Sequence, residues 1–139
     1  MNSGKRIALD VVDTWEGTPG NAEHERIKAE VGDLYIAFLN NIDPLLRRAI
    51  KAVVRTRSVD AAARYVNGTV QFVFLDGGHS REAVAADIAA WYPKVRPGGY
   101  IGGHDFSYNW MGVVESVLRF TNGRNFEVIG NSWLYRKEK

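Results

Sequence analysis

The feature that most constrains the fold is the stretch from Thr69 to Phe106, TVQFVFLDGGHSREAVAADIAAWYPKVRPGGYIGGHDF. It opens with an apolar run, Val70 to Leu75, which is typical of a parallel strand covered on both faces. A helical segment capped by Ser80 follows, and Pro97-Gly98-Gly99 then leads into a second strand, Tyr100 to Gly103. The apolar residues at helical spacing are Val84, Ile88 and Trp91. The stretch therefore predicts a β-α-β unit with a right-handed crossover and two parallel strands.

Acidic and imidazole side chains stand where these two strands end. Asp76 directly follows the first strand, His104-Asp105 directly follows the second, and His79 lies on the turn into the helix. Because both strands point the same way, their carboxyl ends meet at one edge, where ligands bind in open α/β sheets. Neighbouring strands lie about 4.8 Å apart, so Asp76 and Asp105 are expected to come close enough to share a divalent ion.

Each of these residues also has a purely structural interpretation. Asp76 could cap the following helix, Asp105 could bind loop amides, and His79 could be a polar residue at a helix start. Alternatively, His79 would act as a general base for a substrate hydroxyl, because the ordinary pKa of histidine, about 6.5, suits proton removal at neutral pH.

The N-terminal part of the chain carries strand and helix patterns in alternation. Ile7 to Asp13 and Ala52 to Thr56 predict strands. Between them, Thr14 to Asn21 predicts a loop, and Ala22 to Lys51 has a helical pattern that breaks near Asp43-Pro44. These patterns are those of a second β-α-β arrangement ahead of the central one.

The remaining segments complete the alternation. Ser58 to Val66 and Met111 to Thr121 predict helices, and Phe126 to Gly130 and Ser132 to Arg136 predict an antiparallel hairpin. We therefore expect one domain over residues 1–139 of the α/β class. It would be Rossmann-like, with a mainly parallel sheet, helices on both faces and a C-terminal antiparallel strand pair.

Composition excludes several classes of protein. The 139 residues carry a formal charge of +2 and no cysteine, so a disulfide framework, a thiolate metal site and a cysteine nucleophile are excluded. The small charge gives no reason to expect a nucleic-acid partner, and the basic residues between Arg47 and Arg57 fit a solvated helix face. No apolar run reaches membrane-spanning length and no signal-peptide core is present. We therefore expect a cytoplasmic protein that binds neither nucleic acid nor membrane.

The motifs LDGGH and PGGYIGGHD, together with VVDTWEG and RTRSVDAAARYV, resemble the class I S-adenosylmethionine-dependent methyltransferases. The resemblance is to the O-methyltransferase-like group called methyltransferase family 24, and it covers nearly the whole chain. It implies methyl transfer from S-adenosylmethionine to a hydroxyl oxygen of a small molecule or sugar.

Under this resemblance Ile7 to Asp13 is the family's second strand. We therefore expect a fold truncated at the N-terminus, without the family's first strand, its helix and the glycine-rich loop that holds the cofactor's methionine end. Alternatively, Ile7 to Asp13 is the first strand, and Gly17-x-x-Gly20 takes the place of that loop.

The resemblance also implies roles for individual residues. Asp13 would bind the ribose hydroxyls, Ser58 would lie near the adenine, and Asp76 would complete the cofactor-binding set. Asp13 and Ser58 have structural alternatives, as a loop acid that caps the next segment and as a helix N-cap.

A divalent metal and a catalytic pair complete the implied site. Asp76, His104 and Asp105 are the candidate ligands for Mg²⁺, and the imidazole among them would also admit manganese, iron or zinc. Asp76 and His79 are the candidate catalytic residues.

Two rival hypotheses belong to other classes. A truncated, catalytically incompetent methyltransferase fold could serve as a binding or oligomerisation module, because open sheet edges and apolar surface favour self-association. We accordingly expect a homo-oligomer. The Asp/His cluster could instead serve a metal-dependent hydroxylase or hydrolase that uses no S-adenosylmethionine, since one fold hosts many chemistries.

Overall fold

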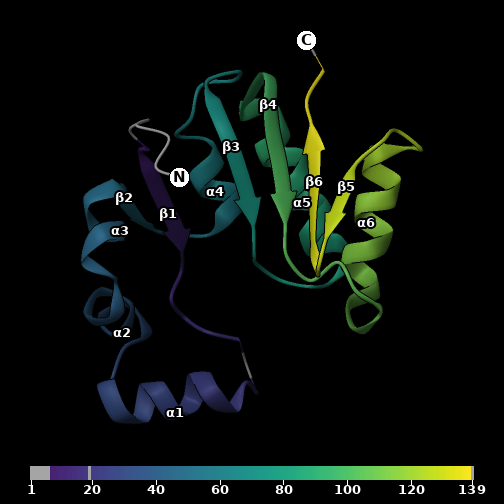
Figure 1. Ribbon diagram of the computed structural model, residues 1–139. Helices are drawn as coiled ribbons and strands as arrows, with labels where there is room; N and C mark the ends of the chain where they lie inside the picture. Colours follow the sequence, from purple (N-terminus) through teal and green to yellow (C-terminus); the bar gives the residue numbers. More distant parts are fainter. Residues whose placement is uncertain (1–6, 19, 139) are drawn as a thin grey trace. The chain divides into compact units, whose positions relative to one another are not determined.

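Parallel strand pairs connected through helices form the framework of the chain, as the alternating pattern predicts (Figure 1). The computed structural model describes residues 7–18 and 20–138. These residues form two units, the first ending at Arg57 and the second beginning at Ser58. The α/β class and the C-terminal antiparallel strand pair are confirmed.

The first unit is a parallel pair of strands with three helices between them. Strand β1 (Leu9–Asp13) pairs with β2 (Ile50–Arg55), and Asp13 lies opposite Arg55 at the carboxyl ends. The connecting helices are α1 (Ala22–Val31), α2 (Leu34–Asn41) and α3 (Pro44–Ala49).

Two predicted helices are shorter in the structure. The helical pattern from Ala22 to Lys51 breaks at Gly32 as well as at the predicted place, because Gly32 adopts φ 84° and the Asp33 side chain caps the next helix. Glycine takes this left-handed backbone at little steric cost. The second correction concerns α4 (Ser58–Ala62), which ends well before the predicted Val66.

The second unit contains a four-stranded sheet in the order β3-β4-β6-β5. Its strands are β3 (Val70–Leu75), β4 (Val95–Gly103), β5 (Glu127–Ile129) and β6 (Ser132–Arg136). Strands β3 and β4 are parallel, and β6 is antiparallel to both of its neighbours. Its other elements are α4, α5 (Arg81–Trp91), α6 (Met111–Thr121) and the short 3₁₀ helices η1 (Tyr92–Lys94) and η2 (Tyr108–Trp110). Among the described residues no helix is both long enough and apolar enough to cross a membrane.

The core of the second unit combines residues of α5 and α6 with residues of the sheet. The inner face of α5 is the predicted one, since Val84, Ile88 and Trp91 are all buried. Their buried companions are Val113 and Val117 on α6 and Val73, Ile101, Trp133 and Tyr135 on the strands. Side chains alternate between the faces of a strand. On β3, accordingly, Val73 is buried whereas Phe72 and Phe74 are 52% and 49% exposed.

Two glycines allow the strands to meet closely at the carboxyl end of β4. A Cβ on Gly102 would lie 2.5 Å from the backbone oxygen of Trp133, and one on Gly103 would lie 2.6 Å from that of Leu75. Any side chain at either position would push β4 away from its neighbours. The next residue, His104, donates its backbone N–H to the Leu75 oxygen at 3.0 Å. The chain thus leaves β4 directly beside the end of β3.

Candidate functional site

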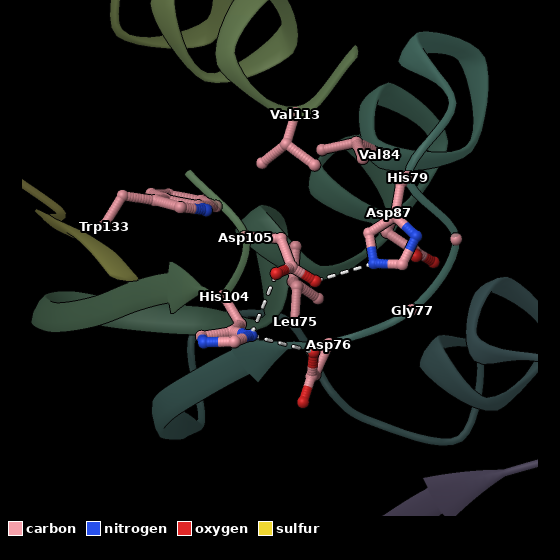
Figure 2. A pocket seen from close by; sticks show the side chains of 11 residues that line it. Leu75, Asp76, Gly77, His79, Val84, Asp87, His104, Asp105, Val113 and Trp133 are labelled. Carbon is pink, nitrogen blue, oxygen red and sulfur yellow. Dashed lines mark hydrogen bonds and ion pairs between the residues drawn. The ribbon is translucent and has the colours of Figure 1, made fainter. Parts of the chain in front are cut away.

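The carboxyl ends of β3 and β4 bring Asp76, His104 and Asp105 together (Figure 2). One ligand atom of each residue lies within 4.8 Å of the others. His104 Nδ1 is 3.8 Å from Asp76 Oδ1 and 3.3 Å from Asp105 Oδ1. This proximity follows from the strand register, which pairs Leu75 with Gly103 so that the following residues emerge side by side. The structure therefore gathers the three residues that the sequence suggested as metal ligands.

Asp105 also contacts His79, and in Figure 2 it lies between the two imidazoles. His79 Nε2 is 2.7 Å from Asp105 Oδ2, a distance typical of a charge-assisted hydrogen bond. Asp105 thus engages His79 with one oxygen and faces His104 with the other. Its side chain is only 20% exposed, whereas that of Asp76 is 63% exposed. Asp105 is the inner carboxylate of the site and Asp76 is the outer one.

The backbone of Asp105 is left-handed, with φ 59°. Such a φ is uncommon for a residue other than glycine, although aspartate tolerates it better than most. Hydrogen bonds hold the turn that follows it: the Phe106 N–H donates to the Asn131 oxygen and the Ser107 N–H to the Asp105 oxygen, each at 2.8 Å. Strained conformations of this kind are common at functional sites.

A narrow cavity extends inward from this edge of the sheet. Its volume is about 20 Å³, enough for a single water molecule or ion. The polar residues that line it include Asp76, His79, His104 and Asp105. The other lining residues, apart from one, are Gly77, Gly78 and the apolar residues Leu75, Val84, Val113 and Trp133. The last lining residue is Asp87 on α5, which the sequence reasoning did not identify.

Asp87 is a half-buried acid on the apolar stripe of α5. Burial raises the pKa of its carboxyl, and a hydrogen bond with the Ser58 hydroxyl opposes that rise. Asp87 follows Val84 by three positions and precedes Ile88, so a charged residue lies on the otherwise apolar face of this helix. The sequence alone contains this irregularity, which could have identified Asp87 as a candidate site residue.

Ser58, proposed from the sequence to lie near the cofactor's adenine, is already engaged within the second unit. Its Oγ accepts the Nε1–H of Trp91 at 2.9 Å and its hydroxyl is hydrogen-bonded to Asp87. A hydroxyl has one proton and two lone pairs. Ser58 can therefore still accept one hydrogen bond from a ligand, but its own proton is used inside the protein.

Asp13, proposed from the sequence to bind ribose, ends β1 in the first unit. Its Oδ1 accepts the backbone N–H of Trp15 at 2.7 Å, and Trp15 has a left-handed φ of 54°. One carboxylate oxygen of Asp13 therefore caps the next segment, as the structural alternative predicts. Among the described residues the other carboxylate oxygen has no hydrogen-bond partner, and Asp13 lines a cavity of about 270 Å³ within this unit.

Gly17 and Gly20, the alternative glycine pair, both adopt φ 77°. A Cβ on Gly17 would lie 2.9 Å from Leu34 Cδ1 and 3.3 Å from the His24 side chain. The Thr18 N–H donates to His24 Nδ1 at 2.9 Å. Gly17 is therefore accounted for by a turn that packs against α1 and α2.

Comparison with known proteins identifies this fold as that of the class I S-adenosylmethionine-dependent methyltransferases. A family model described as a methyltransferase domain, Methyltransf_24, matches residues 1–106. The chain belongs to this methyltransferase family. The family and the Rossmann-like fold predicted from the sequence are both confirmed.

Solved structures of methyltransferases share this fold. The O-methyltransferase NovP has a TM-score of 0.63 and 14% identity over 98% of this chain and 62% of NovP. CalS11, a TDP-rhamnose 3′-O-methyltransferase of calicheamicin biosynthesis, has a TM-score of 0.56 and 14% identity over 93% of this chain and 58% of CalS11.

A third solved structure is MycE of the mycinamycin biosynthetic pathway, in complex with Mg and S-adenosylhomocysteine. It has a TM-score of 0.53 and 16% identity over 95% of this chain and 46% of MycE. The chain thus spans about three fifths of NovP and CalS11 and less than half of MycE. A comparison with curated protein sequences gives no match.

The raised pKa of Asp87 makes folding stability depend on pH in a defined direction. A carboxyl whose folded pKa is raised stabilises the fold below its ordinary pKa, about 4, and this contribution is lost as the pH rises through the folded value. Asp87→Asn is neutral at every pH and keeps an oxygen that can accept from Ser58. The free energy of unfolding of Asp87→Asn, relative to wild type, is therefore expected to be higher at about pH 7 than at about pH 4.

Urea unfolding of both proteins at the two pH values measures this difference. Glu82→Gln removes an exposed acid from the same helix and is the matched control. A stability difference for Asp87→Asn that is the same at both pH values would contradict the prediction.

Proposed function

We propose that this chain carries the methyl-transfer site of an S-adenosylmethionine-dependent O-methyltransferase that acts on a hydroxyl of a small molecule or sugar. The observation that carries the proposal is the juxtaposition of Asp76, His104 and Asp105 with His79 at the carboxyl ends of two parallel strands. Ligands bind at this edge in open α/β sheets.

The side chains at this edge fit a divalent cation. Asp76 and Asp105 offer carboxylate oxygens and His104 offers an imidazole nitrogen, all within 4.8 Å of one another. Asp76 and His104 are 63% and 45% exposed, which leaves room for water or an acceptor hydroxyl as further ligands. Two oxygens favour Mg²⁺, and the nitrogen extends the range to manganese, iron and zinc. A cation bound here would stabilise the negative charge of a deprotonated hydroxyl.

His79 is proposed as the general base. Its Nε2 is bonded to Asp105 at 2.7 Å, and a carboxylate accepts hydrogen bonds, so the neutral ring carries its proton on Nε2. Nδ1 then has the free lone pair that can take the proton of an acceptor hydroxyl. Asp105 stabilises the positive charge that this transfer leaves on the imidazole. Asp76, the outer carboxylate, is proposed to orient the acceptor.

Asp13, Ser58 and Asp76 are proposed to hold the cofactor. The free oxygen of Asp13 suits a ribose hydroxyl, because a carboxylate accepts hydrogen bonds from a diol. Ser58 is restricted to accepting, which suits an amino group such as that of adenine. Likeness of fold supports these choices. CalS11, which is named for methylation of a sugar, supports the acceptor, and MycE, solved with Mg and S-adenosylhomocysteine, supports the metal and the cofactor.

S-adenosylhomocysteine is expected to bind the chain in isothermal titration calorimetry. Asp13→Asn keeps an oxygen for the Trp15 N–H but replaces the free carboxylate oxygen with an amide N–H₂ that cannot accept. This variant is expected to bind about 10- to 100-fold more weakly, because a hydrogen bond to a charged group contributes about 1.5–3 kcal/mol. Glu16→Gln, in the same loop, is the control and should bind like wild type.

The absence of binding heat and of a thermal shift with wild type at about millimolar S-adenosylhomocysteine would overturn the proposal. Metal binding without binding of this ligand would instead favour a metal-dependent hydrolase or hydroxylase.

Mn²⁺ is the spectroscopic probe for the metal site. Electron paramagnetic resonance titration is expected to show binding to wild type and at least about tenfold weaker binding to Asp76→Asn and to Asp105→Asn, because each variant loses an anionic ligand. His79→Gln removes the hydrogen-bond partner of Asp105 but none of the proposed ligands, so its Mn²⁺ affinity should fall by about tenfold, the lower end of the effect of losing such a partner, and by less than that of either Asp variant. Unchanged Mn²⁺ affinity in Asp105→Asn would show that this cluster does not hold the metal.

The exposed face of β3 favours the oligomerisation module as a second candidate function. Strand β3 lies at one edge of its sheet, and the rings of Phe72 and Phe74 are 6.1 Å apart and half exposed on one face. Paired exposed aromatic residues on an edge strand are a typical site of self-association.

The cytoplasmic location expected from the sequence stays a prediction.

Multi-angle light scattering is expected to give a dimer or a larger assembly for wild type. Phe72→Ser combined with Phe74→Ser should shift the protein towards the monomer, because each ring would lose the apolar burial that drives association. Tyr108→Ser removes a ring that is 94% exposed on η2 and serves as the control. A wild-type monomer at high micromolar concentration would contradict the oligomer.

A further inference from the structure

The imidazole of His79 is held on one edge and on one face. Its edge is bonded to Asp105 through Nε2 at 2.7 Å. Its face stacks on the indole of Trp110, with ring centroids 3.9 Å apart and an angle of 23° between the planes. The link to Cβ and a single hydrogen bond at Nε2 hold the ring at two ends but leave it free to rotate about the line between them. The stack removes that rotation, so both contacts together define the plane of the ring.

The backbone around Trp110 packs directly against the turn that carries His79. Gly112, two residues after Trp110, lies so close to the His79 oxygen and the Arg81 nitrogen that a Cβ there would overlap both. Ser116 Oγ donates to the Arg81 oxygen at 3.0 Å. The start of α6 and the turn before α5 therefore form one packed contact, which places the indole over the imidazole.

Trp110 contributes little to the core. It is 42% exposed, whereas Trp91 and Trp133 are 6% and 2% exposed. The Trp110 backbone N–H is bonded to the Ser107 oxygen at 2.9 Å and would be bonded in the same way with any residue except proline at this position. The stack on His79 is therefore the specific contribution of the indole.

We propose that Trp110 is a positioning residue that fixes the plane of the His79 imidazole and keeps water from one of its faces. Nδ1, the nitrogen that Asp105 does not engage, is then presented to an acceptor hydroxyl in a single orientation. The catalytic consequence rests on the proposed function, whereas the orientation of the ring does not. Small misplacements of a reacting group can cost about 100-fold in rate, so restraint of this kind is worth a dedicated residue.

Nuclear magnetic resonance of protein with ¹³C- and ¹⁵N-labelled histidine tests the proposal without a substrate. The chain has three histidines, and the signals of His79 are those lost in His79→Gln. In wild type the ring protons of His79 are expected to be displaced upfield by the indole, and ¹³C relaxation should report a rigid ring. In Trp110→Leu the displacement should vanish and the order parameter of the ring should fall. Trp110→Phe should retain part of the displacement and the rigidity.

Tyr108→Leu, in the same 3₁₀ helix, is the control and should leave the His79 signals unchanged. Urea unfolding of each variant separates a loss of ring order from a loss of stability. His79 signals in folded Trp110→Leu that match wild type in shift and order would overturn the proposal.

Titration of the same samples with S-adenosylhomocysteine keeps the two proposals apart. If wild type does not bind it, the proposed function fails, and the ring measurements still decide whether Trp110 positions His79.

Discussion

The close approach of β3 and β4 at their carboxyl ends is the constraint on which the candidate site depends. Gly103 leaves room for β3, because a Cβ there would lie 2.6 Å from the Leu75 oxygen, and Gly102 leaves room for β6 on the other side of β4, because a Cβ there would lie 2.5 Å from the Trp133 oxygen. Because the strands are so close, Asp76 and His104 leave the sheet side by side. The glycines of this motif therefore act through packing, and the charged residues beside them supply the chemistry that we propose.

Asp105 contacts both of the histidine side chains in the candidate site. One oxygen binds His79, the other faces His104, and the left-handed backbone at φ 59° places both. If the edge holds a cation, as we propose, the cation and His79 share this carboxylate. The proposed metal site and the proposed general base would thus depend on the placement of one side chain.

The regular elements were predictable because their periodicity is local. An apolar run located β3, helical spacing located the inner face of α5, and the parallel crossover predicted the meeting of Asp76 and Asp105. The break at Gly32 was missed because the apolar spacing continues past it, and a single glycine within such a pattern is a weak indication of a helix end. Asp87 was missed because its burial and its hydrogen bond with Ser58 exist only in the folded chain.

The sequence by itself determined the family, the α/β class and the polar residues at the strand ends. Motifs and hydrophobic periodicity depend only on residues that are close together in the chain, so they can be recognised without the fold. Only the tertiary structure decided which of those residues contact one another. The bond of His79 to Asp105, the stack of Trp110 on His79 and the engagement of Ser58 by Trp91 join residues far apart in the chain. Contacts of this kind depend on the distance and angle between packed elements, which no local pattern of residues specifies.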